Sequence, residues 1–213
     1  MEQKKISKSV LKRLPGYLAY LKNMPDNAPM HISATALANA LGMGEVQVRK
    51  DLAMVSDGGR PKIGYLRESL IEDIEQFLGY DNTTVAVLAG PGKLGQALMA
   101  YNGFDEYGLN ILAAFDARPK RDKTDEGKPI YPISELAKFC RTHKVLMGII
   151  TTPAEAAQEV ADQLIAGGIK AIWNFAPTHL DVPSNILVQN ENMATSLAVL
   201  SVHLQAQMKD DKL

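Results

Sequence analysis

The stretch VAVLAGPGKLGQAL, residues 85–98, decides the fold of the larger part of the chain. It begins inside a continuous apolar run, residues 84–89, which is typical of a strand buried on both faces of a parallel sheet. Gly90, Gly92 and Gly95 follow, and the chain then returns to a helical pattern. In a strand, loop and helix with this spacing, the first glycine permits a tight turn, the second lets the backbone approach a pyrophosphate, and the third lets helix and strand pack closely. The stretch therefore predicts a Rossmann-like unit that holds a dinucleotide at a helix N-terminus.

A carboxylate follows at the position where such a unit needs one. A second apolar strand, residues 110–116, ends in Asp116, which lies 21 residues beyond Gly95. A carboxylate there accepts hydrogen bonds from the adenosine ribose and repels a 2′-phosphate, which favours NAD over NADP. Because Arg118, Lys120 and Arg121 lie close behind it, the choice between the two cofactors stays open at this point.

The remainder of this region alternates between helices and strands. We expect helices over residues 134–142 and 153–166 and strands over residues 145–150 and 171–175, an order that predicts a doubly wound parallel sheet. Ligands of such sheets bind at the carboxyl ends of the strands. Candidates for the nicotinamide half are therefore Thr152, Pro153, Asn174, Phe175 and Ala176. An ordinary strand-end turn explains the NFAP stretch, residues 174–177, equally well.

The first third of the chain has the pattern of a helix-turn-helix. A helix over residues 9–23, kinked or broken at Pro15 and Gly16, precedes a second helix that starts at the N-cap Ser33 and ends at Gly42. A third helix, residues 44–55, is predicted to bury Val46, Val48 and Leu52. Its outward residues Gln47, Arg49 and Lys50 suit the edges and phosphates of a major groove. The alternative is a helical hairpin with a solvated, charged face.

The next ten residues, SDGGRPKIGY at 56–65, predict a tight β-hairpin, or wing. Arg60, Pro61 and Lys62 would present cations from a proline-stiffened backbone, which suits the narrow minor groove of A·T-rich DNA. Plain surface charges on a turn are the alternative. A wing directly after a helix-turn-helix favours DNA binding.

Composition and charge are consistent with two modules. The chain has 213 residues and a net charge of −1, but residues 1–65 hold ten Lys or Arg and five Asp or Glu, which leaves the remainder at −6. A single cysteine, Cys140, excludes an internal disulfide framework. No signal-like or membrane-length apolar run occurs, so we expect a soluble cytoplasmic protein.

The C-terminal helix, residues 192–208, is apolar on nearly all sides, which indicates cover by a second subunit. No catalytic group is predicted, because His179 is the one histidine near the expected crevice and Asp181 offers it no convincing dyad. No metal site is predicted either. The sequence thus favours a protein that senses a dinucleotide over an enzyme.

Taken together, several stretches resemble the Rex family of redox-sensing transcriptional repressors, and the resemblance spans almost the whole chain. They are KSVLKRLPGYLAYL, QVRKDL, GRPKIGY, GPGKLGQAL, AAFDARP and TTPAEAAQEVADQLIAGGIKAIWNFAP. The resemblance implies an N-terminal winged helix-turn-helix domain (residues 1–80), a Rossmann-like NAD(H)-binding domain (81–190) and a domain-swapped dimerisation helix with a tail (191–213). It also implies a homodimer on double-stranded operator DNA that NADH releases and NAD permits to bind.

The resemblance also assigns residues to these roles. The expected cofactor-binding residues are Gly90, Pro91, Gly92, Lys93, Leu94, Gly95, Tyr101, Asp116, Arg118, Thr152, Pro153, Ala154, Asn174, Phe175, Ala176 and Pro177. The expected DNA-binding residues are Ser33, Gln47, Arg49, Lys50, Arg60, Pro61 and Lys62.

Three departures from the family pattern concern function. The family usually reads RKDLSYFGEFGxRGxGY where this chain has RKDLAMVSDGGRPKIGY, so we expect a different operator. Lys93 stands where the family often has asparagine, and the positive charge of the lysine would strengthen phosphate binding. The family's switch pairs an arginine in the first helix with an aspartate before the C-terminal helix, and Ala19 and Asn192 stand at these positions.

Two other classes of protein remain as alternatives. One is an NAD-dependent oxidoreductase with a basic N-terminal module, and the other is a CoA- or nucleotide-binding subunit of a larger enzyme.

Overall fold

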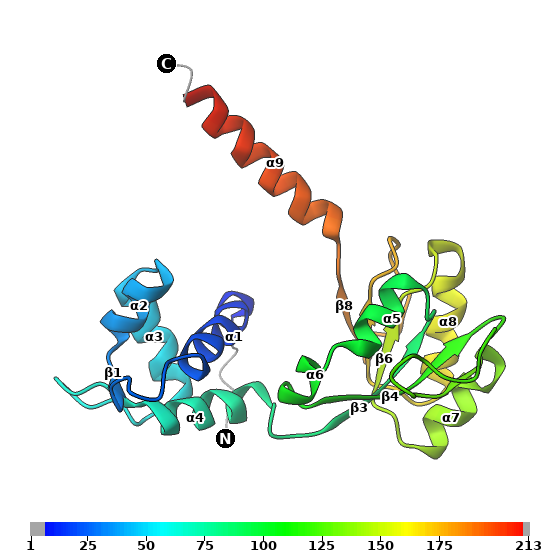
Figure 1. Cartoon of the computed structure of the whole chain (residues 1–213). Helices are drawn as coiled ribbons and strands as arrows, with labels where there is room; N and C mark the ends of the chain where they lie inside the picture. Colours follow the sequence, from blue (N-terminus) through cyan, green and yellow to red (C-terminus); the bar gives the residue numbers. More distant parts are fainter. Residues whose placement is uncertain (1–6, 211–213) are drawn as a thin grey trace. The chain divides into compact units, whose positions relative to one another are not determined.

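A computed structural model describes residues 7–210. Two compact units divide the chain, with the boundary between Asn82 and Thr83, and each is described by itself (Figure 1). The first six residues of the predicted N-terminal domain and the last three of the predicted tail lie outside the described residues.

The first unit packs four helices around one core. It contains α1 (Lys8–Lys22), β1 (His31–Ile32), α2 (Ala34–Leu41), α3 (Glu45–Val55), β2 (Tyr65–Leu66) and α4 (Arg67–Leu78). The expected break in α1 is wrong, since the helix continues through Pro15 and Gly16. Its start is capped by the Ser7 hydroxyl, and Leu14, Tyr17 and Leu18 are fully buried on one face. Packing of this face compensates for the hydrogen bond that proline cannot donate.

The predicted helix-turn-helix is confirmed. Ser33 caps α2 by accepting a hydrogen bond from the N–H of Ala36 at 3.0 Å, and Gly42 ends the helix with φ +63°. Val48 and Leu52 are fully buried on α3 as expected. Val46, however, is 63% exposed, so its expected burial is wrong. Two residues along an α-helix correspond to a rotation of about 200°, which places Val46 opposite the buried Val48.

The predicted wing is much smaller than a regular hairpin. A single antiparallel bridge joins Arg60 to Gly64, with reciprocal backbone hydrogen bonds of 2.9 Å. The expected second arm, β2, pairs instead with β1, with Ile32 opposite Tyr65. The wing is therefore a tight turn attached to a two-stranded sheet.

The second unit is a six-stranded parallel sheet in the order β5-β4-β3-β6-β7-β8. Its elements are β3 (Thr84–Ala89), α5 (Lys93–Ala100), α6 (Gly103–Glu106), β4 (Leu109–Asp116), β5 (Ile130–Pro132), a 3-10 turn (Ile133–Glu135), α7 (Leu136–Thr142), β6 (Met147–Ile150), α8 (Ala154–Ala166), β7 (Ala171–Asn174), β8 (Leu187–Asn190) and α9 (Met193–Asp210). This order is the Rossmann arrangement, which confirms the predicted doubly wound sheet. The edge strands β5 and β8 were not predicted, and helix α7 is preceded by the 3-10 turn where one helix was expected.

Two hydrophobic layers cover the two faces of the sheet. Val87 and Phe115 pack with residues of α7 and α8 on one face, and Ala86 and Leu88 pack with Met99 of α5 on the other. Figure 1 shows α5 and α8 flanking the sheet. Because β3 is central and buried on both faces, the loop that follows it has a fixed position.

The C-terminal helix α9 exposes its apolar side chains to solvent. Its large apolar side chains are 53% to 65% exposed, and these are Leu197, Val199, Leu200, Val202, Leu204 and Met208. Exposed apolar area of this kind normally marks a surface that another protein covers. Across residues 7–210, no helix has the length and apolar character needed to cross a membrane.

Candidate dinucleotide site and nucleic-acid interface

The loop between β3 and α5 lies at the centre of the sheet, where the strand order reverses. Gly90 has φ +93°, a conformation that favours glycine, and its N–H donates to the carbonyl of Phe115 on β4 at 2.9 Å. A Cβ at Gly90 would lie 2.9 Å from the backbone of Thr151 and Thr152, which follow β6. The turn after β3 is therefore pressed against the turn after β6, at the crevice where ligands of this fold bind.

Gly95 lets the first turn of α5 approach this crevice. A Cβ there would lie 2.4 Å from the Gly90 carbonyl oxygen and 2.9 Å from Thr151 Oγ1. The Thr151 hydroxyl in turn donates to the Gly90 carbonyl, 2.7 Å away. Sequence reasoning selected Thr152 and missed Thr151, whose hydroxyl ties the ends of β3 and β6 together.

Gly92 differs from the other two glycines of the loop. A Cβ at this position would meet no atom within 4 Å, and its φ of −70° is open to any residue. The protein itself thus does not require glycine here, whereas a ligand that lies against the backbone would. Gly92 is the N-cap of α5, whose first N–H groups and helix dipole favour a phosphate.

A cleft of about 380 Å³ extends from this loop to the end of β4. Its lining includes Gly90, Gly92, Asp116, Thr152 and Pro153, together with α8 residues that were not predicted, Glu159 and Gln163. The Thr152 Oγ1 atom is buried and has no hydrogen-bond partner among the described residues. Buried polar atoms are normally paired, so this hydroxyl fits a ligand that brings its own polar atom into the cleft.

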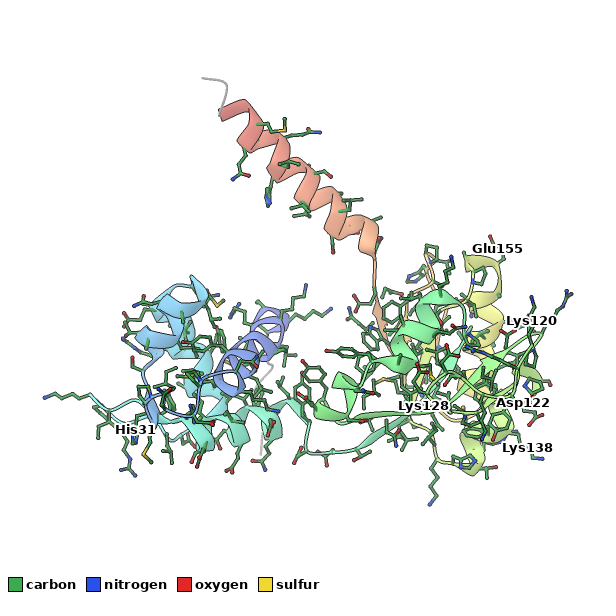
Figure 2. All side chains as sticks on the ribbon, viewed as in Figure 1. His31, Lys120, Asp122, Lys128, Lys138 and Glu155 are labelled. Carbon is green, nitrogen blue, oxygen red and sulfur yellow. The ribbon has the colours of Figure 1, made fainter. Side chains whose placement is uncertain are left out.

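The carboxylate of Asp116 lies at the carboxyl end of β4, on the wall of the cleft. Its Oδ1 accepts a hydrogen bond from the backbone N–H of Arg118 at 2.7 Å, which fixes the side chain at the strand end. The Arg118 side chain itself is exposed, as is Lys120 in the same loop (Figure 2). Of the other predicted loop residues, Pro91 is buried, and Lys93 and Leu94 are exposed.

Most of the residues that were predicted to surround the nicotinamide line two separate cavities. Phe175, Ala176 and Pro177 line a separate cavity of about 590 Å³, whereas Thr152 and Pro153 line the first cleft. Ala154 is the first residue of α8. The cavity of about 590 Å³ is completed by Thr178, His179, Asn190, Glu191, Asn192 and Ala194, so it reaches the first residues of α9.

Asn174 is fully buried, and its amide is used within the protein. Its Nδ2 donates to the Thr178 carbonyl at 3.0 Å and to Asn190 Oδ1 at 2.9 Å, while its Oδ1 accepts from the N–H of Ala176 at 3.0 Å. These bonds hold the turn after β7 against β8. Asn174 therefore holds the turn that lines the 590 Å³ cavity, and both polar atoms of its side chain are already hydrogen-bonded within the protein.

Tyr101 lies in neither cavity, although a line of aromatic rings connects it to one of them. It is 52% exposed at the end of α5 and packs edge-to-face on Phe104, with ring centroids 4.9 Å apart. Phe104 contacts Trp173 at 5.7 Å, and Trp173 contacts Phe175 at 4.8 Å. The Trp173 Nε1–H donates to Glu191 at 2.9 Å, a contact across the β7–β8 pair that no local pattern indicates.

On the first unit, Gln47, Arg49 and Lys50 are exposed along α3 as predicted. The Arg49 guanidinium donates to the Glu45 carboxylate one turn earlier, and both side chains are exposed. Ser33 is committed to capping α2. Within residues 7–210, no group of three His, Cys, Asp or Glu side chains is placed to hold a metal ion.

A buried ion pair, which sequence reasoning missed, holds α3 against α1. Asp51 is 3% exposed and accepts hydrogen bonds from Arg13 Nε at 2.7 Å, Arg13 Nη2 at 2.8 Å and the Tyr17 hydroxyl at 2.8 Å. Burial, followed by the hydrogen bond to Asp51, raises the pKa of Tyr17 to about 12. The same carboxylate raises the pKa of Arg13. A bidentate arginine pair with a third donor fixes the rotation of α3 about its axis.

The wing presents its cations from a strained turn. The Ile63 N–H donates to the Arg60 carbonyl at 3.2 Å, and Pro61 and Lys62 occupy the two central positions. Lys62 has φ +66°, in a position where such turns favour glycine or asparagine. The exposed side chains of Arg60, Pro61 and Lys62 form the tip as predicted.

Comparisons with known proteins cover both units. A family described as "CoA binding domain" matches residues 81–178, and one described as "Putative DNA-binding protein N-terminus" matches residues 5–53. The redox-sensing transcriptional repressor Rex of Porphyromonas gingivalis is 40% identical over 197 residues, which cover 92% of this chain and 90% of the relative. The Rex protein of Clostridium botulinum is 39% identical over 212 residues, covering 97% and 99%.

Solved structures show the same similarity. RSP in complex with β-NAD+ and operator DNA superposes with a TM-score of 0.89 and 32% identity, over 99% of this chain and 97% of that one. RSP in complex with β-NADH superposes with a TM-score of 0.86 and 31% identity, over 99% of each chain.

Proposed function

The chain belongs to the Rex family of redox-sensing transcriptional repressors, and we propose that its first unit binds operator DNA while its second unit senses the NADH/NAD+ ratio. It is a repressor and not an enzyme, and its ligands are NAD+ and NADH. The observation that carries this function is the similarity over 99% of the chain to a repressor bound to both β-NAD+ and operator DNA. The geometry of the glycine loop and of the helix-turn-helix supports it independently.

In the second unit, the pyrophosphate lies on the glycine loop and the N-terminus of α5, held by Gly90, Pro91, Gly92, Lys93, Leu94 and Gly95. Asp116 binds the adenosine ribose, with Arg118 beside it, and this carboxylate favours NAD(H) over NADP(H). Thr152, Pro153 and Ala154 face the middle of the dinucleotide. The turn of Asn174, Phe175, Ala176 and Pro177, together with Tyr101, surrounds the nicotinamide region.

In the first unit, α3 enters the major groove with Gln47, Arg49 and Lys50, and the wing tip of Arg60, Pro61 and Lys62 enters the minor groove. Ser33, at the start of α2, contacts the DNA backbone. The fixed rotation of α3, held by Asp51, supports this role because base readout needs a defined helix face.

The working form is a homodimer in the cytoplasm, in which α9 swaps between subunits. The exposed apolar surface of α9 supports this arrangement, because a second copy of the chain would cover it. A twofold-symmetric protein in turn matches a palindromic operator.

The test is a titration of operator binding with NADH, NAD+, NADPH and CoA. NADH should weaken DNA binding roughly 5- to 150-fold relative to NAD+, the range of typical allosteric couplings. NADPH and CoA should act only at much higher concentrations. Equal effects of NADH and NAD+ would contradict a redox sensor and would leave a dinucleotide-stabilised DNA-binding protein.

A further inference from the structure

Val46 is an exposed apolar side chain near the start of α3, where the other exposed side chains are polar. It is the second residue of α3 and is 63% exposed, while Val48 on the opposite side is fully buried. The core of the first unit therefore does not use Val46. The valine lies on the face that also carries Arg49 and Lys50, since these follow it by three and four residues.

The start of α3 also carries little side-chain bulk. The N-cap is Gly44, and a Cβ at this position would meet no atom within 4 Å. Residues at the N-terminus of a recognition helix approach base edges most closely. Val46 is thus placed where a small apolar side chain can reach the floor of a major groove.

Among the groups that base pairs present in the major groove, the thymine C5-methyl is the apolar one. Valine in a helix strongly prefers a single χ1 rotamer, so Val46 loses little side-chain freedom when it makes a contact. The neighbouring Arg49 donates to the Glu45 carboxylate one turn earlier, so charged groups stand beside the valine on this face. We propose that Val46 is a specificity-determining residue that reads the methyl group of one thymine in each operator half-site; this rests on the proposed DNA-binding function.

The experiment uses the full chain with NAD+ and a duplex selected by the wild-type protein from random-sequence DNA. Each thymine of a half-site is replaced in turn by deoxyuridine, which lacks only the methyl group. The dissociation constant is measured for the wild type, for Val46→Ala and for Met30→Ala. Met30 is the matched control, because it is 72% exposed in the same unit but lies outside α3.

The wild type and Met30→Ala should lose about fourfold in affinity at one thymine of each half-site, the effect of one buried methyl group. Val46→Ala should bind the thymine duplex about fourfold more weakly per half-site, and uracil at that position should cost it nothing more. Equal sensitivity of Val46→Ala and the wild type at every thymine would overturn the proposal. Failure to select any duplex would instead refute the DNA-binding function itself.

Discussion

Two glycines of the same loop should respond in opposite ways to one added methyl group. At Gly92 a Cβ meets no protein atom within 4 Å, and φ −70° suits alanine. At Gly95 a Cβ would lie 2.4 Å from the Gly90 carbonyl oxygen and 3.0 Å from Leu88 Cδ2. Gly92→Ala therefore tests the ligand site, and Gly95→Ala tests the packing of α5 on β3.

The expected magnitudes follow from these contacts. Gly95→Ala forces helix and strand apart and should lower the free energy of unfolding by about 1–3 kcal/mol, as overpacking does. Gly92→Ala should change it by less than about 1 kcal/mol, because the restriction that alanine places on the unfolded chain is opposed by the poorer capping of α5 by alanine. If its methyl group displaces a phosphate from the backbone, the loss of a charge-assisted hydrogen bond, about 1.5–3 kcal/mol, weakens dinucleotide binding roughly 10- to 150-fold.

The assays separate the two effects. Urea unfolding without ligand is followed by the fluorescence of Trp173, the single tryptophan of the chain, which lies on β7 in the second unit. NADH affinity is measured by calorimetry. The concentration of NADH that releases the wild type from DNA should no longer release Gly92→Ala. The reasoning is refuted if Gly92→Ala binds NADH like the wild type, or if it destabilises the second unit as much as Gly95→Ala does.

Three further predictions concern the first unit. Asp51→Asn leaves the Arg13 guanidinium without its carboxylate and should cost about 2–4 kcal/mol in urea unfolding followed by far-UV circular dichroism; an unchanged midpoint would contradict this. Because burial and then the hydrogen bond to Asp51 raise the pKa of Tyr17 from 10.0 to about 12, the neutral phenol stabilises the fold fully below pH 10, and this stability is lost as pH rises from 10 to 12. Tyr17→Phe should remove that part of the alkaline transition, and an identical pH profile would exclude Tyr17 as its source. Lys62→Gly should relieve the strain at φ +66° and raise the unfolding free energy by about 0.5 kcal/mol, whereas Lys62→Ala, which keeps the strain, should not.

The features that sequence alone predicted are local ones. The glycine loop, the Ser33 cap and the Gly42 turn each depend on residues within a few positions of one another, so their spacing carries the information. The edge strands β5 and β8 carry no such pattern. They have three and four residues, and β8 has no fully buried residue, so neither shows the long apolar run of a central strand.

The features that sequence missed depend on pairing across long separations. Asp51 meets Arg13 across 38 residues, and Asn174 meets Asn190 across 16. A buried polar side chain looks like a surface residue until its partner is known, because only the partner makes its burial favourable. The error at Val46 has a different cause. Val46 and Val48 are only two positions apart and so cannot lie on the same face of the helix. Val48 and Leu52, four positions apart, lie on the buried face together, which leaves Val46 exposed.

Discrimination between NADH and NAD+ must arise at a different place from general affinity for the dinucleotide. The two forms are identical from the adenine to the pyrophosphate, so contacts with Asp116 and the glycine loop would bind both equally and shift no equilibrium. The differences, a positive charge and a planar aromatic ring in NAD+, lie at the nicotinamide. The cavity of about 590 Å³ proposed for that region is lined by Glu191 and Asn192, and Asn192 Oδ1 accepts a hydrogen bond from the Thr195 N–H at 3.2 Å in the first turn of α9. A nicotinamide bound there would place its change of ring charge beside Asn192 and Ala194 at the start of α9, and an effect through these residues would not need the charged pair replaced by Ala19 and Asn192.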